Sequence, residues 1–154
     1  MAEAVETSAV AARFLVGVAA GGGATLVMDA AMAQLPEGDT PPAVASGVLT
    51  GTAPGEAPER LATVVHYLAG GLTGALFVWL HLVGVALLGD GAGTAVLAGG
   101  LLYALMVGFF AVVVLPRSMV PPERVGAIRR DWAVSAAVYL LVVVPVVAAV
   151  AALQ

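Results

Sequence analysis

Several residue types are missing from this chain of 154 residues, and each absence excludes a kind of chemistry. There is no cysteine, so disulfide bonds, thiolate metal sites and thiol catalysis are excluded. Lysine and asparagine are also missing, and all six basic residues are arginines. Ten acidic residues give a net charge of −4. This balance argues against nucleic-acid binding, which needs clustered positive charge.

Charge of either sign is scarce as well. Only 10% of the residues are charged, whereas 61% are hydrophobic, and the mean hydropathy is +1.04. A soluble domain of this size needs more charged surface, so the composition predicts a lipid bilayer as the surroundings of the chain. The absence of lysine together with the acidic excess resembles proteins of salt-loving archaea, which predicts a halophilic archaeon as the source.

Motifs that would indicate catalysis are missing too. The sequence has no HExxH, no GxSxG, no phosphate-binding loop and no pair of carboxylates within an apolar run. It therefore predicts no catalytic residue, no metal site and no enzymatic activity. One alternative stays open: Met28 and Met32 are spaced to face His66, a set that suits Cu(I). Methionines at this spacing are more typical of core packing.

Four long apolar runs are present, and each can provide the roughly 20 residues that cross a bilayer. Inside lipid the backbone must satisfy its own hydrogen bonds, so each run is expected to be a helix. The sequence predicts an all-α, integral membrane four-helix bundle, up-down-up-down, as a single domain over 1–154. The acidic start of the chain is unlike a signal peptide, so the first run is expected to be retained. The predicted spans are residues 11–35, 61–88, 92–115 and 132–153.

The connections between the runs differ in length. Residues 36–60 are rich in proline and glycine. Within them Thr40 followed by Pro41 is a helix-start signal and Gly51 is a stop signal, which predicts a short interfacial helix at 41–50. Its apolar residues Val44, Val48 and Leu49 are expected to face the membrane. The second connection, Gly-Asp-Gly-Ala-Gly, is a tight turn, so the helices on either side of it are expected to be antiparallel neighbours.

The distribution of arginine predicts the orientation. In an up-down bundle, the connections 36–60 and 116–131 lie on the same side of the membrane. They hold five of the six arginines, and the opposite side holds only Arg13. Positively charged loops remain in the cytoplasm. The sequence therefore predicts a multi-pass cell-membrane protein with both connections cytoplasmic and both termini outside.

Two ionisable residues lie inside the apolar runs, where a charge is costly and therefore indicates function. Asp29 precedes the end of the first run, and His66 follows the start of the second, so each lies roughly 8–9 Å from the same end of the bundle. Helical periodicity permits contact between them, with Thr25 on the same face as Asp29. Arg117 and Arg130 lie at the same membrane boundary and are expected to be able to join them.

Small residues predict the faces on which the first two spans pack. Gly17 and Gly21, like Gly70 and Gly74, are separated by three residues, a spacing that lets helix backbones approach closely in lipid. Gly22 lies within about 40° of Asp29 on the helical wheel and is assigned to the same packing face. The ionisable pair is therefore expected to point into the bundle.

The remaining histidine and the tryptophans are interpreted by their depth. His81 lies about 22 Å along the same helix from His66, so the two cannot bind one haem. An intramolecular haem site would require methionine as the second axial ligand. We expect His81 and Trp79 in the outer interfacial belt and Trp132 in the inner one.

A short motif resembles a known group of proteins. Ala-Thr-Leu-Val-Met-Asp at 24–29, then Val-His-Tyr with Gly70 in the second run, resembles small four-helix membrane proteins of the YagU-like kind. The resemblance is strongest over residues 17–80. It implies a four-helix topology and a polar site at Asp29, His66 and Tyr67, but no assigned activity. The chain departs from that group in its acidity and in its shorter, arginine-rich third connection.

Three functional interpretations remain open. The first is a helical bundle that supports solute or proton movement or the assembly of a membrane complex. Such a bundle can act as a homo-oligomer and requires no cofactor. The second is the anchor subunit of a redox complex, with quinone or haem near Asp29 and His66. The third is a passive partner subunit within a larger membrane complex. A purely structural role for the Asp29–His66 pair, fixing helix register, is also open.

Overall fold

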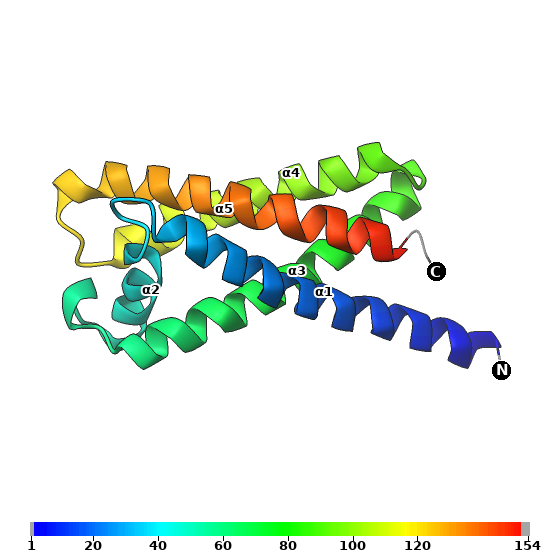
Figure 1. Ribbon diagram of the computed structural model, residues 1–154, viewed down its shortest axis with the longest axis horizontal. Helices are drawn as coiled ribbons and strands as arrows, with labels where there is room; N and C mark the ends of the chain where they lie inside the picture. The colour runs from blue at the N-terminus through cyan, green and yellow to red at the C-terminus, as the bar shows by residue number, and fades with distance from the viewer. Residues whose placement is uncertain (1, 152–154) are drawn as a thin grey trace.

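The computed structural model describes residues 2–151, and the side chains of residues 9–151. Regular structure within this range is entirely helical (Figure 1). The α-helices are α1 (Ala2–Met32), α2 (Thr40–Thr50), α3 (Glu59–Leu88), α4 (Ala92–Phe109) and α5 (Pro122–Ala151). A 3₁₀ turn, η1 (Pro54–Glu56), precedes α3, and α4 continues as a π-helix, η2 (Phe110–Val114), and a further 3₁₀ turn, η3 (Leu115–Arg117).

Four of these helical segments are long and apolar enough to cross a membrane. This confirms the all-α membrane bundle, and the chain is a multi-pass membrane protein by its helices. The first span ends before the predicted residue 35, because residues 33–35 already turn towards α2. The last span begins at Pro122, ten residues before the predicted residue 132, because α5 already starts within the third connection. Residues 152 and 153 of that predicted span lie outside the described residues. The spans are Ala9–Met32, Glu59–Leu88, Ala92–Arg117 and Pro122–Ala151.

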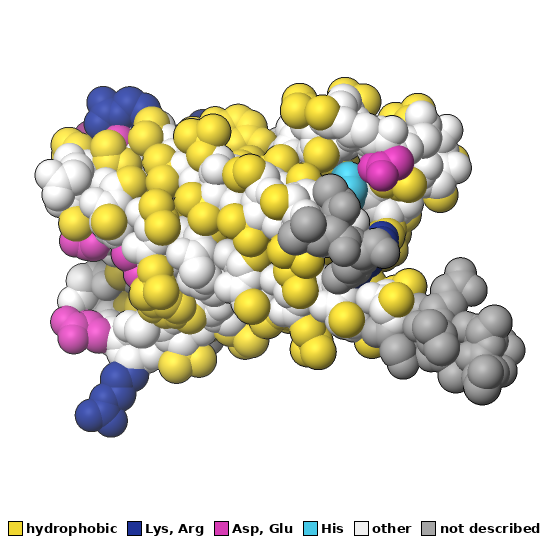
Figure 2. Space-filling view, turned by 45° about the vertical axis from the view of Figure 1, so that its right-hand side comes forward, with side chains coloured by type: hydrophobic (Ala, Val, Ile, Leu, Met, Phe, Trp, Pro, Cys, Tyr) yellow, Lys and Arg dark blue, Asp and Glu magenta, His cyan; other side chains and the backbone are white. Residues whose placement is uncertain are grey.

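The spans run alternately up and down (Figure 1). α1 packs between α3 and α5, and α4 packs against both of those helices. α3 and α4 meet at the tight turn, whereas towards the opposite end of the molecule α2 lies beside α3. Figure 2 shows apolar side chains over the middle of the molecule and charged side chains gathered towards its two ends. This distribution is the one that a membrane-spanning bundle requires.

The crossing of α1 and α3 is close because glycines lie on both sides of it. A Cβ atom added to Gly21 would lie 3.0 Å from the Cα of Gly74, and one added to Gly17 would lie 2.8 Å from the carbonyl oxygen of Gly74. Gly70 lies at the same crossing, against Thr25. The assignment of Gly22 to this face is wrong: a Cβ there would meet no atom within 4 Å, because Gly22 points away from α3.

The short helix α2 spans nearly the predicted residues but lies differently. It was expected to rest at the membrane interface on Val44, Val48 and Leu49. Instead Val44 is fully buried in a cluster with Phe110, Leu115 and Ile128, whereas Leu49 is 65% exposed. α2 thus packs against the end of the bundle, because burying its apolar face against α5 and η2 removes that face from water.

Candidate functional site

Asp29, His66 and Tyr67 form a hydrogen-bonded cluster, which we call the polar triad. Nε2 of His66 lies 2.7 Å from Oδ1 of Asp29. The Tyr67 hydroxyl donates to Oδ2 of Asp29 at 2.5 Å. The two rings meet edge to face, with centroids 5.7 Å apart. Both carboxylate oxygens of Asp29 are therefore held by side chains of α3.

Helix geometry explains this contact. Asp29 lies in the last turn of α1, and His66 lies in the second turn of α3. Because α1 and α3 are antiparallel and cross closely at their glycines, the two positions meet at the same depth. The His66 side chain is 11% exposed, whereas the Asp29 side chain is 37% exposed. The carboxylate therefore remains accessible from one side.

That side is an open cavity of about 720 Å³, which we call the loop-side cavity. The polar triad lies on its wall, next to the 54–57 segment. Asp39 and Glu59 also line it, so the cavity is acidic as well as accessible. Protons and small cations can approach Asp29 by this route.

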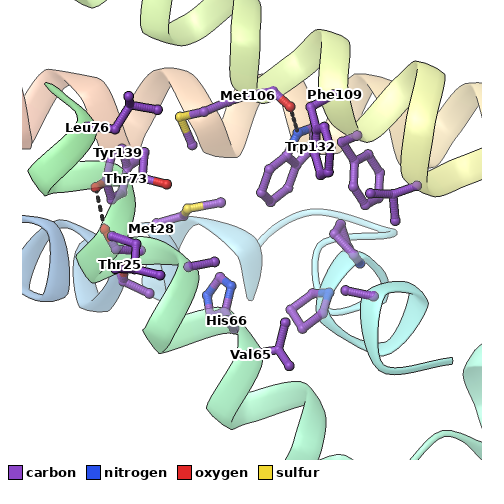
Figure 3. Close-up of a pocket in the computed structure, with 18 residues that line it drawn as sticks. Thr25, Met28, Val65, His66, Thr73, Leu76, Met106, Phe109, Trp132 and Tyr139 are labelled. Carbon is purple, nitrogen blue, oxygen red and sulfur yellow. Dashed lines mark hydrogen bonds between the residues drawn. The ribbon is translucent and has the colours of Figure 1, made fainter. Parts of the chain in front are cut away.

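A second cavity lies on the other side of His66. This apolar pocket has a volume of about 370 Å³ and is lined by residues of all five α-helices and η2 (Figure 3). Figure 3 shows His66 pointing from α3 into the pocket, below Met28. His66 thus lines both cavities. The other side chains that define the pocket include Thr25, Thr73, Leu76, Met106, Phe109, Phe110, Trp132 and Tyr139.

Most polar groups in the apolar pocket are already bonded. The hydroxyl of Thr25 donates to the carbonyl of Gly21 at 2.8 Å, and that of Tyr139 donates to the carbonyl of Gly70 at 2.7 Å. Trp132 Nε1 donates to the carbonyl of Met106 at 3.2 Å (Figure 3). Within residues 9–151, Nδ1 of His66 and the hydroxyl of Thr73 have no hydrogen-bond partner. These two groups are available to a ligand.

The two arginines expected near Asp29 do not join it, and this prediction is wrong. Nη1 of Arg117 donates to the carbonyl of Val113 at 2.5 Å. Nε of Arg130 donates to Oδ1 of Asp131 at 2.8 Å. Each guanidinium group bonds to a residue close to it in the chain, so neither reaches across the bundle to Asp29.

Sequence reasoning missed a second polar cluster, which ties the two long connections together. Asp131 is fully buried and accepts the backbone N–H of Glu37 at 2.9 Å. Arg124 donates twice to the Glu37 carboxylate, at 2.9 and 2.6 Å, and Thr40 donates once. The hydrogen bonds from Arg124 and then Thr40 lower the pKa of Glu37 to about 2. Asp131 could have been noticed as an acid at the start of the fourth apolar run.

The interfacial-belt assignment is wrong for His81 and Trp132, and it stays a prediction for Trp79. Trp79 is 52% exposed, but His81 is 7% exposed and stacks on Phe77 with centroids 6.0 Å apart. His81 therefore belongs to the bundle interior, because its position on α3 faces α1 and α5. Trp132 also points inward, and the centroid of its ring lies 4.9 Å from that of Phe110.

The mid-span tyrosines and the methionines have ordinary packing environments. The Tyr103 hydroxyl donates to the carbonyl of Ala133 at 3.3 Å, which provides the partner that it needs. Met28 and Met32 are each 2% exposed within the main apolar core.

Comparisons with protein-family models, with curated proteins and with solved structures find no match to this chain. The interpretation of the site therefore depends on its own geometry.

Proposed function

We propose that this chain is a non-enzymatic membrane protein in which the polar triad accepts and releases protons between the loop-side cavity and the apolar pocket. One observation carries the proposal: the imidazole of His66 lies between the two cavities, with Nε2 against Asp29. Imidazole is the side chain best suited to exchange a proton near neutral pH. Its two nitrogens allow uptake on one side and release on the other.

Each member of the polar triad has a role in this scheme. The carboxylate of Asp29 faces the loop-side cavity and can receive a proton from it. By accepting Nε2–H, the carboxylate holds the His66 tautomer in which Nδ1 is the free acceptor. It also stabilises the imidazolium that forms when Nδ1 is protonated. Tyr67 occupies the second carboxylate oxygen and so limits the orientations of Asp29.

The proposed setting is a homo-oligomer or a larger membrane complex in the cell membrane. A bundle of this size is small for a transporter, which usually combines repeated units. The arginine distribution supports cytoplasmic connections at 36–60 and 116–131, with both termini outside. The YagU-like motif supports membership of that group and includes the polar triad. A passive partner subunit is the alternative in which the triad moves no proton.

A flux assay tests the proposal. The protein is reconstituted into liposomes that carry a pH gradient and an internal pH dye. We expect Asp29→Asn and His66→Gln to slow proton flux roughly tenfold or more. His81→Gln is the matched control, because it removes the other histidine of α3 and leaves both cavities unchanged. Variants that elute and unfold like the wild type, yet conduct protons equally well, would overturn the proposal.

The redox-anchor function is a second candidate, and the apolar pocket beside His66 is the observation that favours it. Absorbance spectra and native mass spectrometry of the purified protein separate the possibilities. A Soret band would indicate haem and therefore an anchor role, whereas a bound quinone mass is compatible with both functions. A colourless homo-oligomer without haem would favour proton movement. A colourless monomer would point to a missing partner.

A further inference from the structure

We infer that the apolar pocket binds a lipid-soluble hydroquinone, whose ring lies beside α3 and whose hydroxyl donates a hydrogen bond to Nδ1 of His66. The inference deepens the proposed function, because it rests on His66 as a proton acceptor. It names the chemical class that would share a proton with the polar triad. Three features of the pocket carry it: its lining, its available polar groups and its route to the bilayer.

The lining suits a planar ring. At about 370 Å³ the pocket falls within the range of small-molecule sites, which are mostly apolar with a few placed polar groups. Phe109, Phe110 and Trp132 contribute aromatic faces, and Phe110 and Trp132 pack against each other at an interplanar angle of 32°. Phe110 opens the π-helix η2, a feature that is frequent at functional sites.

The available polar groups select a hydrogen-bond donor. Opposite an ionised Asp29, Nε2 of His66 is the donor, so the neutral ring keeps Nδ1 as an acceptor on a side chain that lines the pocket. A ligand that satisfies Nδ1 must bring an O–H or N–H group. Thr73 lies seven residues further along α3, roughly 10.5 Å from His66 on a similar face, and its hydroxyl can meet a second ligand oxygen. A hydroquinone carries hydroxyls at opposite ends of its ring.

The pocket opens towards lipid. Leu72 and Leu76 of α3 and Phe109 of α4 line it and are 59%, 38% and 61% exposed on the surface of two membrane spans. A ligand with an isoprenoid tail can therefore leave that tail among the acyl chains. A phospholipid acyl chain in the same pocket would satisfy neither Nδ1 nor the Thr73 hydroxyl, so the pocket favours the hydroquinone.

Fluorescence of Trp132 provides a direct binding assay. The chain has two tryptophans, so Trp79→Phe leaves Trp132, inside the pocket, as the single indole. The detergent-solubilised full chain is titrated with a brominated short-chain hydroquinone, its dimethyl ether and a brominated phosphatidylcholine. We expect saturable quenching by the hydroquinone and roughly tenfold weaker binding of the ether, which has no O–H to donate. Equal quenching by all three probes would overturn the inference.

A pocket-filling variant completes the test. Ala69 lines the pocket at the exposed surface of α3, so Ala69→Phe is expected to abolish quenching without disturbing the core. Leu68→Phe is the matched control, because Leu68 is 59% exposed and does not line the pocket. Unchanged hydroquinone binding in Ala69→Phe would contradict the assigned site. Quenching without proton flux would refute the proposed function alone, and proton flux without quenching would refute this inference alone.

Discussion

A carboxylate and an imidazole that meet inside a helical bundle can form a functional site or only a contact between helices. The free energy of that contact can be measured. Hydrogen bonds between membrane helices average about 0.6 kcal/mol in double-mutant cycles. The Asp29–His66 contact is short, with 2.7 Å between Nε2 and Oδ1, and Tyr67 holds the same carboxylate. If Asp29 and His66 keep one arrangement, strong energetic coupling between the two side chains is expected.

The first prediction concerns this coupling. In a cycle of Asp29→Asn and His66→Gln, we expect the effects on the free energy of unfolding to be non-additive by about 0.5–2 kcal/mol, because the residues share a hydrogen bond. Unfolding in mixed micelles followed by circular dichroism measures it. A cycle of Asp90→Asn with His66→Gln is the control, since Asp90 lies in the α3–α4 turn. Simple additivity in the first cycle would show that the contact is not formed.

The second prediction concerns Glu37, whose pKa is lowered from 4.5 to about 2 mainly by the Arg124 hydrogen bond. A carboxyl group with a lowered folded-state pKa stabilises the fold above its unfolded pKa. That stabilisation is present above pH 4.5 and disappears as the pH falls from 4.5 towards 2. We expect the melting temperature to fall over this window, with a shallower fall in Glu37→Gln. Glu56→Gln, at an exposed residue, should keep the wild-type slope; the same slope in Glu37→Gln would contradict the prediction.

At the scale of elements, the α1–α3 crossing decides whether the polar triad forms. Two helix backbones approach closely where glycines lie at their crossing, and an added Cβ atom there forces one helix to move. Gly21 faces the carbonyl oxygen of Gly70 and has the Tyr139 hydroxyl 2.9 Å from its virtual Cβ, whereas Gly22 faces open space. Two adjacent glycines in one helix therefore provide a matched comparison.

The third prediction follows from that comparison. Gly21→Ala should destabilise the protein by about 1–3 kcal/mol, because a tightly packed contact must open. Gly22→Ala should be neutral or stabilising by up to about 1 kcal/mol, since alanine favours the helix. Thermal unfolding in detergent measures both variants. Equal effects of the two substitutions would show that α1 is rotated relative to the arrangement described above.

At the scale of the whole molecule, charge is gathered at the ends and the surface between them is apolar (Figure 2). The buried Asp131, with Glu37 and Arg124, holds the two long connections together at one end. The α3–α4 turn with Asp90 lies at the other end. The two ends of the bundle, which lie towards the two sides of a membrane, are thus chemically different.

The fourth prediction tests this arrangement. Because the chain contains no cysteine, single substitutions Glu56→Cys, Met119→Cys and Asp90→Cys each introduce one thiol. In intact cells an impermeant maleimide should label only the cysteine at 90, because arginine-rich connections stay in the cytoplasm. Permeabilised cells should show labelling at all three positions. Labelling at 56 and 119 but not at 90 in intact cells would reverse the proposed orientation.

The sequence by itself determined the helical bundle and the position of one polar contact, between Asp29 and His66. A bilayer accepts apolar runs only as helices or closed barrels, so run length was enough to predict four spans, but not the start of the last one at Pro122. Helical periodicity and equal depth were enough to propose that Asp29 and His66 could meet. Both inferences depend on properties within one helix or on a simple antiparallel pair.

Only the tertiary structure decided how the helices rotate and what the connections contact. The inward position of His81, the burial of Asp131 and the local bonding of Arg117 and Arg130 depend on tilt and on loop path. Periodicity leaves these free, because a turn of one helix about its axis changes no residue spacing. The apolar pocket has the same origin: it exists where α2, α3 and η2 fail to fill the space beside His66. Such a space is a property of packed neighbours rather than of any single segment.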